Sequence, residues 1–104
     1  MPLFVDLNVD PAKEKELLNV YKTQFKPAIS KQPGFSSVQL LKLHSVAGGK
    51  GPGDYIYRLI IQFHKEEQRL TWVATPTHQK LWPLMEANFR GDPKYNAVLY
   101  DAVG

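Results

Sequence analysis

Alternation of apolar and polar positions predicts four β-strands. Residues 3–9 (LFVDLNV) place leucine or valine at every second position, the period of two that a half-buried strand shows. The other segments with strand character are 35–46, 55–63 and 95–103. In 55–63 both sides of the strand carry apolar bulk, which predicts a strand that is covered on both faces.

A helix with an apolar stripe is predicted after the first strand. Asp10 can cap its free N–H groups, and Pro11 suits the first helical position. Apolar residues then follow at spacings of three and four to about Ser30. Pro27 is expected to kink or shorten the last turn.

The second helical region follows the third strand in two pieces. Residues 65–74 (KEEQRLTWVA) predict a short helix with acidic residues in its first turn. Thr75-Pro76 repeats the cap-then-proline signature and begins another helix. Pro83 lies inside that helix, where it predicts a kink or a fresh helical start.

The order of elements, β-α-β-β-α-β, predicts an α+β fold of the ferredoxin-like class, in one domain spanning residues 1–104. Its four-stranded antiparallel sheet should carry both helical regions on one face. The apolar third strand then needs a cover on the other face, and a second copy of the chain is the simplest one. We therefore expect a homodimer that packs sheet against sheet.

Composition and charge narrow the classes of function. The net charge of +3 is spread along the chain, and five of the lysines fall on the first helix, as on a solvated face. With only three arginines, we expect no nucleic-acid partner. No apolar run is long enough to span a membrane, and the absence of cysteine excludes disulfides and thiolate chemistry. The expected location is the cytoplasm.

No metal or cofactor motif is visible. His44, His64 and His78 lack a partner at helical metal-site spacing. The glycine-rich segment 48–54 lies between two strands and does not open a helix, so it fails the context of a nucleotide-binding loop. It is interpreted as a flexible connection that could close over a pocket.

The chain resembles the antibiotic biosynthesis monooxygenase family. The resemblance rests on the opening strand-helix-strand, PGF at 33–35, the segment IIQFHKEEQRLTW and the TPTH that follows it. It implies a dimeric α+β barrel with a pocket between sheet and helices in each subunit. The family places a tryptophan in the short helix and a small residue and a histidine beyond it, which here would be Trp72, Thr75 and His78.

The family includes cofactor-free oxygenases, quinol-oxidising enzymes, heme-degrading enzymes and isomerases, so membership alone does not fix the reaction. In heme-degrading relatives the axial histidine lies ten positions after the tryptophan. That position is Trp82 here, whose indole cannot ligate iron. The resemblance therefore argues against heme, and we expect no cofactor.

Three candidate site residues lie in the segment TWVATPTHQKLW. Trp72 is interpreted either as a core anchor or as a wall for a flat aromatic substrate. Trp82 can face outward or into the same pocket. His78 is either a surface or capping histidine or the catalytic base, because an imidazole can take a phenolic proton near neutral pH.

The remaining candidates are polar residues of the strands. Tyr57, Asn8 and Arg58 could bind substrate, and Tyr57, Asn8 or the Trp72 indole could stabilise a developing oxyanion. Arg58 in an apolar strand is costly unless it is paired, so a salt bridge with Asp6 or Asp101 is the alternative to an anchor for an anionic substrate.

The function that the resemblance implies for these residues is a cofactor-independent monooxygenase acting on a flat aromatic phenol or quinol, with no metal. One alternative is a non-catalytic small-molecule-binding or stress-response module of the same fold. A second is an isomerase of a small metabolite, which would need more buried carboxylates or histidines than the sequence offers.

Overall fold

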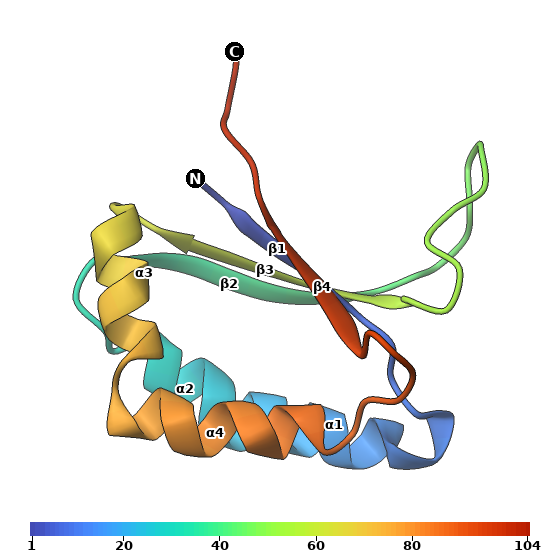
Figure 1. Cartoon of the computed structure of the whole chain (residues 1–104), viewed down its shortest axis with the longest axis horizontal. Coiled ribbons are helices and arrows are strands. Elements are labelled where there is room, and N and C mark those ends of the chain that lie inside the picture. The colour runs from blue at the N-terminus through green and yellow to red at the C-terminus, as the bar shows by residue number, and fades with distance from the viewer.

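The computed structural model, which describes all residues from 1 to 104, contains one four-stranded antiparallel sheet with every helix on one side (Figure 1). The strands lie in the order β2-β3-β1-β4. Their bounds are β1 Leu3–Leu7, β2 Phe35–Lys42, β3 Tyr57–Phe63 and β4 Tyr95–Leu99. This confirms the predicted ferredoxin-like α+β class.

The strands are shorter than the sequence predicts, because their ends lose their partners. After β2 only the Leu43 N–H continues the ladder, donating to the Ile56 carbonyl at 2.7 Å. Strand β4 pairs with β1 alone, and the Tyr100 N–H donates to the Pro2 carbonyl almost at the start of the chain. Beyond these points apolar and polar residues still alternate in the sequence, but no neighbouring strand is present to pair with them.

The first helical region runs from Pro11 to Ile29 in four segments. A 3₁₀ turn η1 (Pro11–Lys13) leads into α1 (Glu14–Val20), a π turn η2 (Tyr21–Phe25) and α2 (Lys26–Ile29). Asp10 caps the start as predicted, accepting from the Ala12 N–H at 3.0 Å. The π turn precedes Pro27, with the Lys26 N–H bonded to the Tyr21 carbonyl five residues back. The wider turn thus takes the helix past the proline.

The second helical region consists of α3 (Glu66–Val73) and α4 (Pro76–Glu86). Thr75 caps α4 as predicted. The predicted fresh start at Pro83 is wrong, because α4 continues through this residue. Leu81 and Met85 lie buried on the inner face of α4 while Pro83 is exposed, so packing on either side of the proline outweighs the lost N–H.

The core lies between the helices and the inner face of the sheet. Alternate residues of β3 point into it, with Leu59 fully buried and Ile61 6% exposed, whereas Arg58 and Gln62 on the outer face are exposed. In Figure 1, α1 and α4 run side by side under the sheet, and α3 stands across one end. No helix is long and apolar enough to cross a membrane.

Candidate functional site

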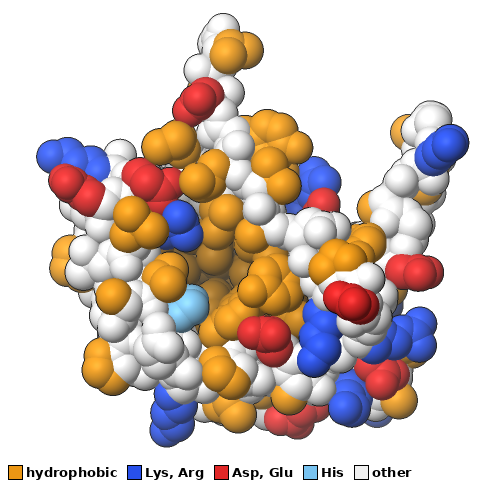
Figure 2. Space-filling view, in the orientation of Figure 1, with side chains coloured by type: hydrophobic (Ala, Val, Ile, Leu, Met, Phe, Trp, Pro, Cys, Tyr) orange, Lys and Arg blue, Asp and Glu red, His pale blue; other side chains and the backbone are white.

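A pocket of about 200 Å³ opens between the sheet and the helices. We call it the aromatic hollow. Its floor is the inner face of three adjacent strands: Leu3, Val5, Ile61, Tyr95 and Ala97. Its walls are side chains of η2, α3 and α4: Phe25, Arg69, Trp72, Val73, His78 and Trp82. Figure 2 shows the hollow lined by apolar side chains, with a histidine at its margin.

Both tryptophans line the hollow. Trp72 is 2% exposed and meets the ring of Phe25 edge-on at 6.1 Å between centroids. Trp82 is half-buried and packs edge-on against Tyr95 at 5.3 Å. Trp72 is therefore both a core anchor and part of the pocket wall, and Trp82 faces inward.

His78 lies between the two indoles. Its ring meets Trp72 edge-on at 5.1 Å and stacks on Trp82 at 6.3 Å with an interplanar angle of 11°. Its Nδ1 is buried and has no hydrogen-bond partner. Burial lowers the pKa of His78 below its ordinary value, and the charge of Arg69 lowers it further. The imidazole is therefore held neutral, as a proton acceptor must be.

Thr75 links α3 to α4 at this corner. Its hydroxyl donates to the Trp72 carbonyl at 2.7 Å and accepts from the His78 backbone N–H at 3.1 Å. One side chain therefore closes the last turn of α3 and opens the first turn of α4. This fixes the two helices that carry the rings of the hollow.

Arg69 is a charged residue of the hollow that sequence reasoning missed. Its Nε donates to the Glu66 carboxylate one helical turn earlier, and their side chains are only 17% and 22% exposed. The spacing to Trp72 is the signal that could have found it, since residues three apart share one face of a helix. Arg69 is the only lining side chain with a permanent charge, and His78 is the only one of a type that can gain a proton near neutral pH.

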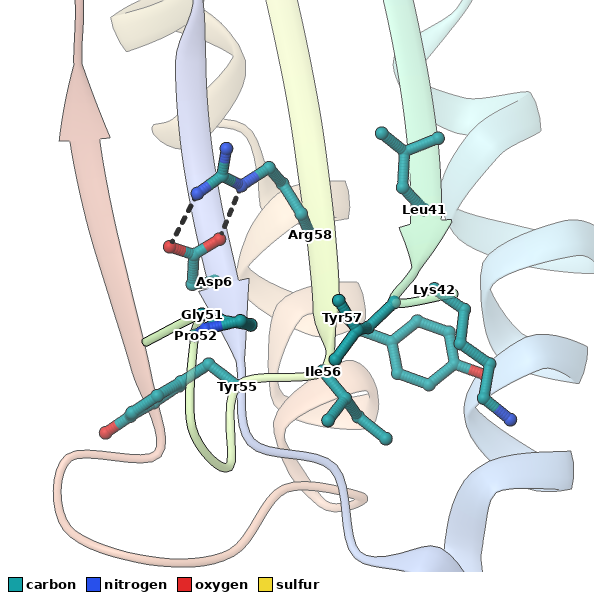
Figure 3. A pocket seen from close by; sticks show the side chains of 10 residues that line it. Asp6, Leu41, Lys42, Gly51, Pro52, Tyr55, Ile56, Tyr57 and Arg58 are labelled. Atoms are coloured by element: carbon teal, nitrogen blue, oxygen red, sulfur yellow. Dashed lines mark hydrogen bonds and ion pairs between the residues drawn. The ribbon is translucent and has the colours of Figure 1, made fainter. Parts of the chain in front are cut away.

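The fold does not bring Tyr57 and Arg58 to the hollow. They line a larger, open groove of about 530 Å³ beside the loop between β2 and β3 (Figure 3). Arg58 lies on the outer face of the sheet, where it forms the expected ion pair with Asp6 at 2.7 Å. Tyr57 points the other way, and its hydroxyl donates to Glu14 Oε2 at 2.7 Å.

The Tyr57 phenol is a poor proton donor for chemistry. Burial raises its pKa well above the ordinary value, and the accepting carboxylate of Glu14 raises it further. Lys42 binds the same Glu14 oxygen at 2.7 Å. These three residues connect the end of the β2–β3 pair to α1. The charges of Lys42 and Glu14 are paired with each other.

Asn8 lines neither pocket. It is 8% exposed at the end of β1, where its backbone bonds to Lys94 and Arg90. A side chain at Gly91 would come within 2.7 Å of the Asn8 amide nitrogen, so the glycine allows this close approach. The structure thus divides the predicted set: Trp72, His78 and Trp82 share the hollow, whereas Tyr57, Arg58 and Asn8 lie elsewhere.

No group of three or more histidine, aspartate or glutamate side chains is placed to hold a metal ion. Among the rings of the hollow, only His78 could ligate iron. Its Nδ1 is buried without a hydrogen-bond partner, and Trp82, the residue at the position where the resemblance expects an axial histidine, is an indole on the wall of the hollow.

Known structures share this fold over nearly the whole chain. A dimeric ferredoxin-like protein of unknown function from Jannaschia sp. CCS1 superposes with a TM-score of 0.82 at 14% identity, covering 97% of both chains. A protein from Caulobacter crescentus CB15 assigned to the antibiotic biosynthesis monooxygenases gives 0.75 at 18% identity, covering 99% of this chain and 89% of its own. SnoaB, a cofactor-independent oxygenase from Streptomyces nogalater, gives 0.70 at 19%, covering 97% and 91%.

The chain has the fold of the antibiotic biosynthesis monooxygenases. Further structures assigned to this family, from Nitrosomonas europaea and Bordetella bronchiseptica among others, match in the same way. The resemblance drawn from the sequence is thereby confirmed at the level of the fold. No family model matches the sequence, and no curated protein matches it. The likeness is therefore one of architecture, and it does not determine the chemistry of the hollow.

Proposed function

We propose that the protein is a cofactor-independent oxygenase that acts on a flat aromatic phenol or quinol bound in the aromatic hollow. The single observation that carries the proposal is the neutral His78 imidazole between two indole rings at the edge of an apolar pocket. A flat ring stacks well on such a surface, and a neutral imidazole accepts a proton. SnoaB, which has the same fold, is described as a cofactor-independent oxygenase.

In this proposal His78 takes the phenolic proton, and the ionised substrate supplies the electrons. The phenolate transfers one electron to O₂, and the resulting radical pair forms a carbon–oxygen bond at a ring carbon that carries one hydrogen in the anion. The peroxide anion then takes the proton back from His78. Loss of water from the hydroperoxide leaves a carbonyl, so one oxygen atom enters the product and the other leaves as water. The protein contributes orientation, a dry pocket and the Trp72 indole N–H toward the developing negative charge.

Oxygen uptake by chelator-treated protein tests this proposal. We expect uptake with dihydroxynaphthalenes, and a fall of at least about tenfold in His78→Ala. His64→Ala is the matched control, because His64 is exposed and lies outside the hollow. Undiminished uptake in His78→Ala would remove the base, and no uptake above buffer across the panel would overturn the oxygenase.

A non-catalytic binding module is the second candidate, and one observation favours it. The buried Nδ1 of His78 has no carboxylate or carbonyl partner, so nothing raises the basicity of the imidazole, and burial lowers it. A weak base suits binding as well as catalysis. Saturable binding of aromatic ligands without oxygen uptake would select this candidate.

We also propose that two copies of the chain pack through the outer faces of their sheets. Phe4, Ile60 and Val98 lie in one row across this face, and Val98 is 45% exposed. Leu41 in the next row is 44% exposed. Exposed apolar side chains on a sheet face favour an interaction site, and the Jannaschia protein of the same fold is described as dimeric.

A further inference from the structure

The walls of the aromatic hollow carry one permanent positive charge. Arg69 lines the hollow together with His78, while the other nine lining side chains are apolar or aromatic. Its guanidinium keeps its proton at any working pH. Burying a cation in an apolar pocket costs free energy unless an anion pairs with it. The anions near Arg69 therefore indicate which kind of ligand the pocket can bind.

Glu66 occupies only one of the donor nitrogens of Arg69. The carboxylate accepts from Nε through one oxygen, and its other oxygen, Oε2, is buried without a partner. Glu66 lies in the first turn of α3, where the helix dipole stabilises its negative charge. With Nε held by this carboxylate, the two terminal nitrogens of Arg69 are the donors that remain for a group in the hollow.

A guanidinium binds a carboxylate through two parallel N–H groups, which gives both strength and direction. Arg69 and His78 both line the same pocket of about 200 Å³, so a ligand in the hollow can reach both residues. One end of a flat ring would then face a proton acceptor, and another substituent would face a cation.

We propose that Arg69 is the specificity residue of the hollow and binds a carboxylate of the substrate. This inference rests on the proposed function, because it names the substrate class of the same site. The hollow of about 200 Å³ is smaller than the roughly 300–1,000 Å³ of sites for drug-sized ligands. The substrate class is therefore hydroxylated aromatic acids of one or two fused rings.

Titration calorimetry with a charged and a neutral probe of equal shape tests the assignment. We expect 2-naphthoate to bind the wild-type protein about tenfold to a hundredfold more tightly than 2-naphthamide, the difference that a charge-assisted hydrogen bond makes. Arg69→Gln should abolish this preference, and an unchanged circular dichroism spectrum shows that the variant is folded. Arg69→Lys, which keeps the charge but not the paired donors, should retain part of it.

Two further variants separate charge from structure. Arg90→Gln removes the same charge at an exposed position outside the hollow and should leave the preference intact. Glu66→Gln removes the competing anion and should strengthen naphthoate binding. A loss in Glu66→Gln as large as that in Arg69→Gln would assign the pair a purely structural role and overturn the proposal.

The outcome also separates this inference from the function on which it rests. Equal affinities of the wild-type protein for both probes would contradict carboxylate binding by Arg69 but would leave the hollow as an aromatic site. Binding of neither probe would contradict the hollow as an aromatic site, and the proposed function would fall with it.

Discussion

At the scale of single residues, the His78 ring has the surroundings that decide the chemistry of the hollow. Trp72 contacts it edge-on, Trp82 stacks on it, and its Nδ1 is buried without a partner, while Arg69 lines the same hollow. A proton on this ring would place a second positive charge beside Arg69 in an apolar pocket. The folded protein therefore disfavours the imidazolium form.

The lowered pKa of His78 predicts a loss of stability in acid. Above the unfolded value of about 6.5 the imidazole is neutral in both states, so it imposes no penalty. As the pH falls through that value, the unfolded chain takes up the proton first, and the free energy of unfolding decreases until the folded pKa is passed. Denaturant titrations between about pH 7 and pH 5 should show a smaller decrease for His78→Gln than for the wild type.

His44→Gln is the matched control, because His44 is exposed and bonds only to the neighbouring Ser45. Its stability should follow the wild-type dependence on pH. If the wild type and His78→Gln lost stability in parallel, His78 would not be the residue that senses acid.

Sequence reasoning placed some site residues and misplaced others for a physical reason. Trp72, His78 and Trp82 come from one helical corner, so their proximity follows from local spacing. Tyr57 and Arg58 are neighbours on β3 whose side chains point to opposite faces of the sheet. Which face is filled, and by what, depends on helices distant in sequence, and composition does not reveal that.

At the scale of elements, the corner between α3 and α4 positions the hollow. Thr75 joins the carbonyl of Trp72 to the N–H of His78 through one hydroxyl. Helix ends leave such groups unpaired, and a single capping side chain satisfies one of them on each side. The sequence reveals this corner because the cap-then-proline signature is local.

Replacing Thr75 should therefore weaken both the fold and the site. Thr75→Val keeps the shape but removes both hydrogen bonds, and we expect the free energy of unfolding to drop by about 1–2 kcal/mol. Ligand affinity should drop as well, since Trp72 and His78 lose their common anchor. Thr71→Val, which removes only a hydroxyl bonded to its own helix, should stay within about 0.5 kcal/mol. Equal losses in the two variants would show that the corner has no special role.

Pro83 shows that packing between elements can outweigh a local sequence rule. Pro83 was expected to kink the helix or to start a new one, yet Leu81 and Met85 lie buried on either side of it and α4 is continuous. The predicted strands were too long because apolar and polar residues continue to alternate in the sequence beyond the last residue that has a partner strand. Both errors concern contacts between elements, which a single sequence pattern does not encode.

At the scale of the whole molecule, the two faces of the sheet differ in how they are covered. The inner face is buried under the helices, whereas the outer face leaves Leu41 and Val98 exposed and Phe4 partly exposed in a single chain. Arg58 lies over the Phe4 ring on this face, 5.1 Å from its centroid. An apolar sheet face with paired charges in its second row is suited to a symmetric partner.

The proposed dimer predicts a mass in solution of twice the 11.8 kDa of the chain. Ile60→Glu places an unpaired charge in the centre of the outer face and should shift light-scattering masses to the monomer. Leu70→Glu changes a residue that is 54% exposed on α3 and should leave the dimer intact. A monomeric wild type at micromolar concentration would contradict the proposal.

The central claim is that the aromatic hollow binds a flat ring, and quenching of tryptophan fluorescence tests it most directly. The chain has two tryptophans and both line the hollow. We predict that 2-methyl-1,4-naphthoquinone quenches Trp72→Phe and Trp82→Phe alike in a saturable manner. Ala97→Phe, which fills the floor, should weaken binding at least about tenfold, whereas Ala47→Phe in the exposed loop should not. Unchanged affinity in Ala97→Phe would place the ligand elsewhere and contradict the account.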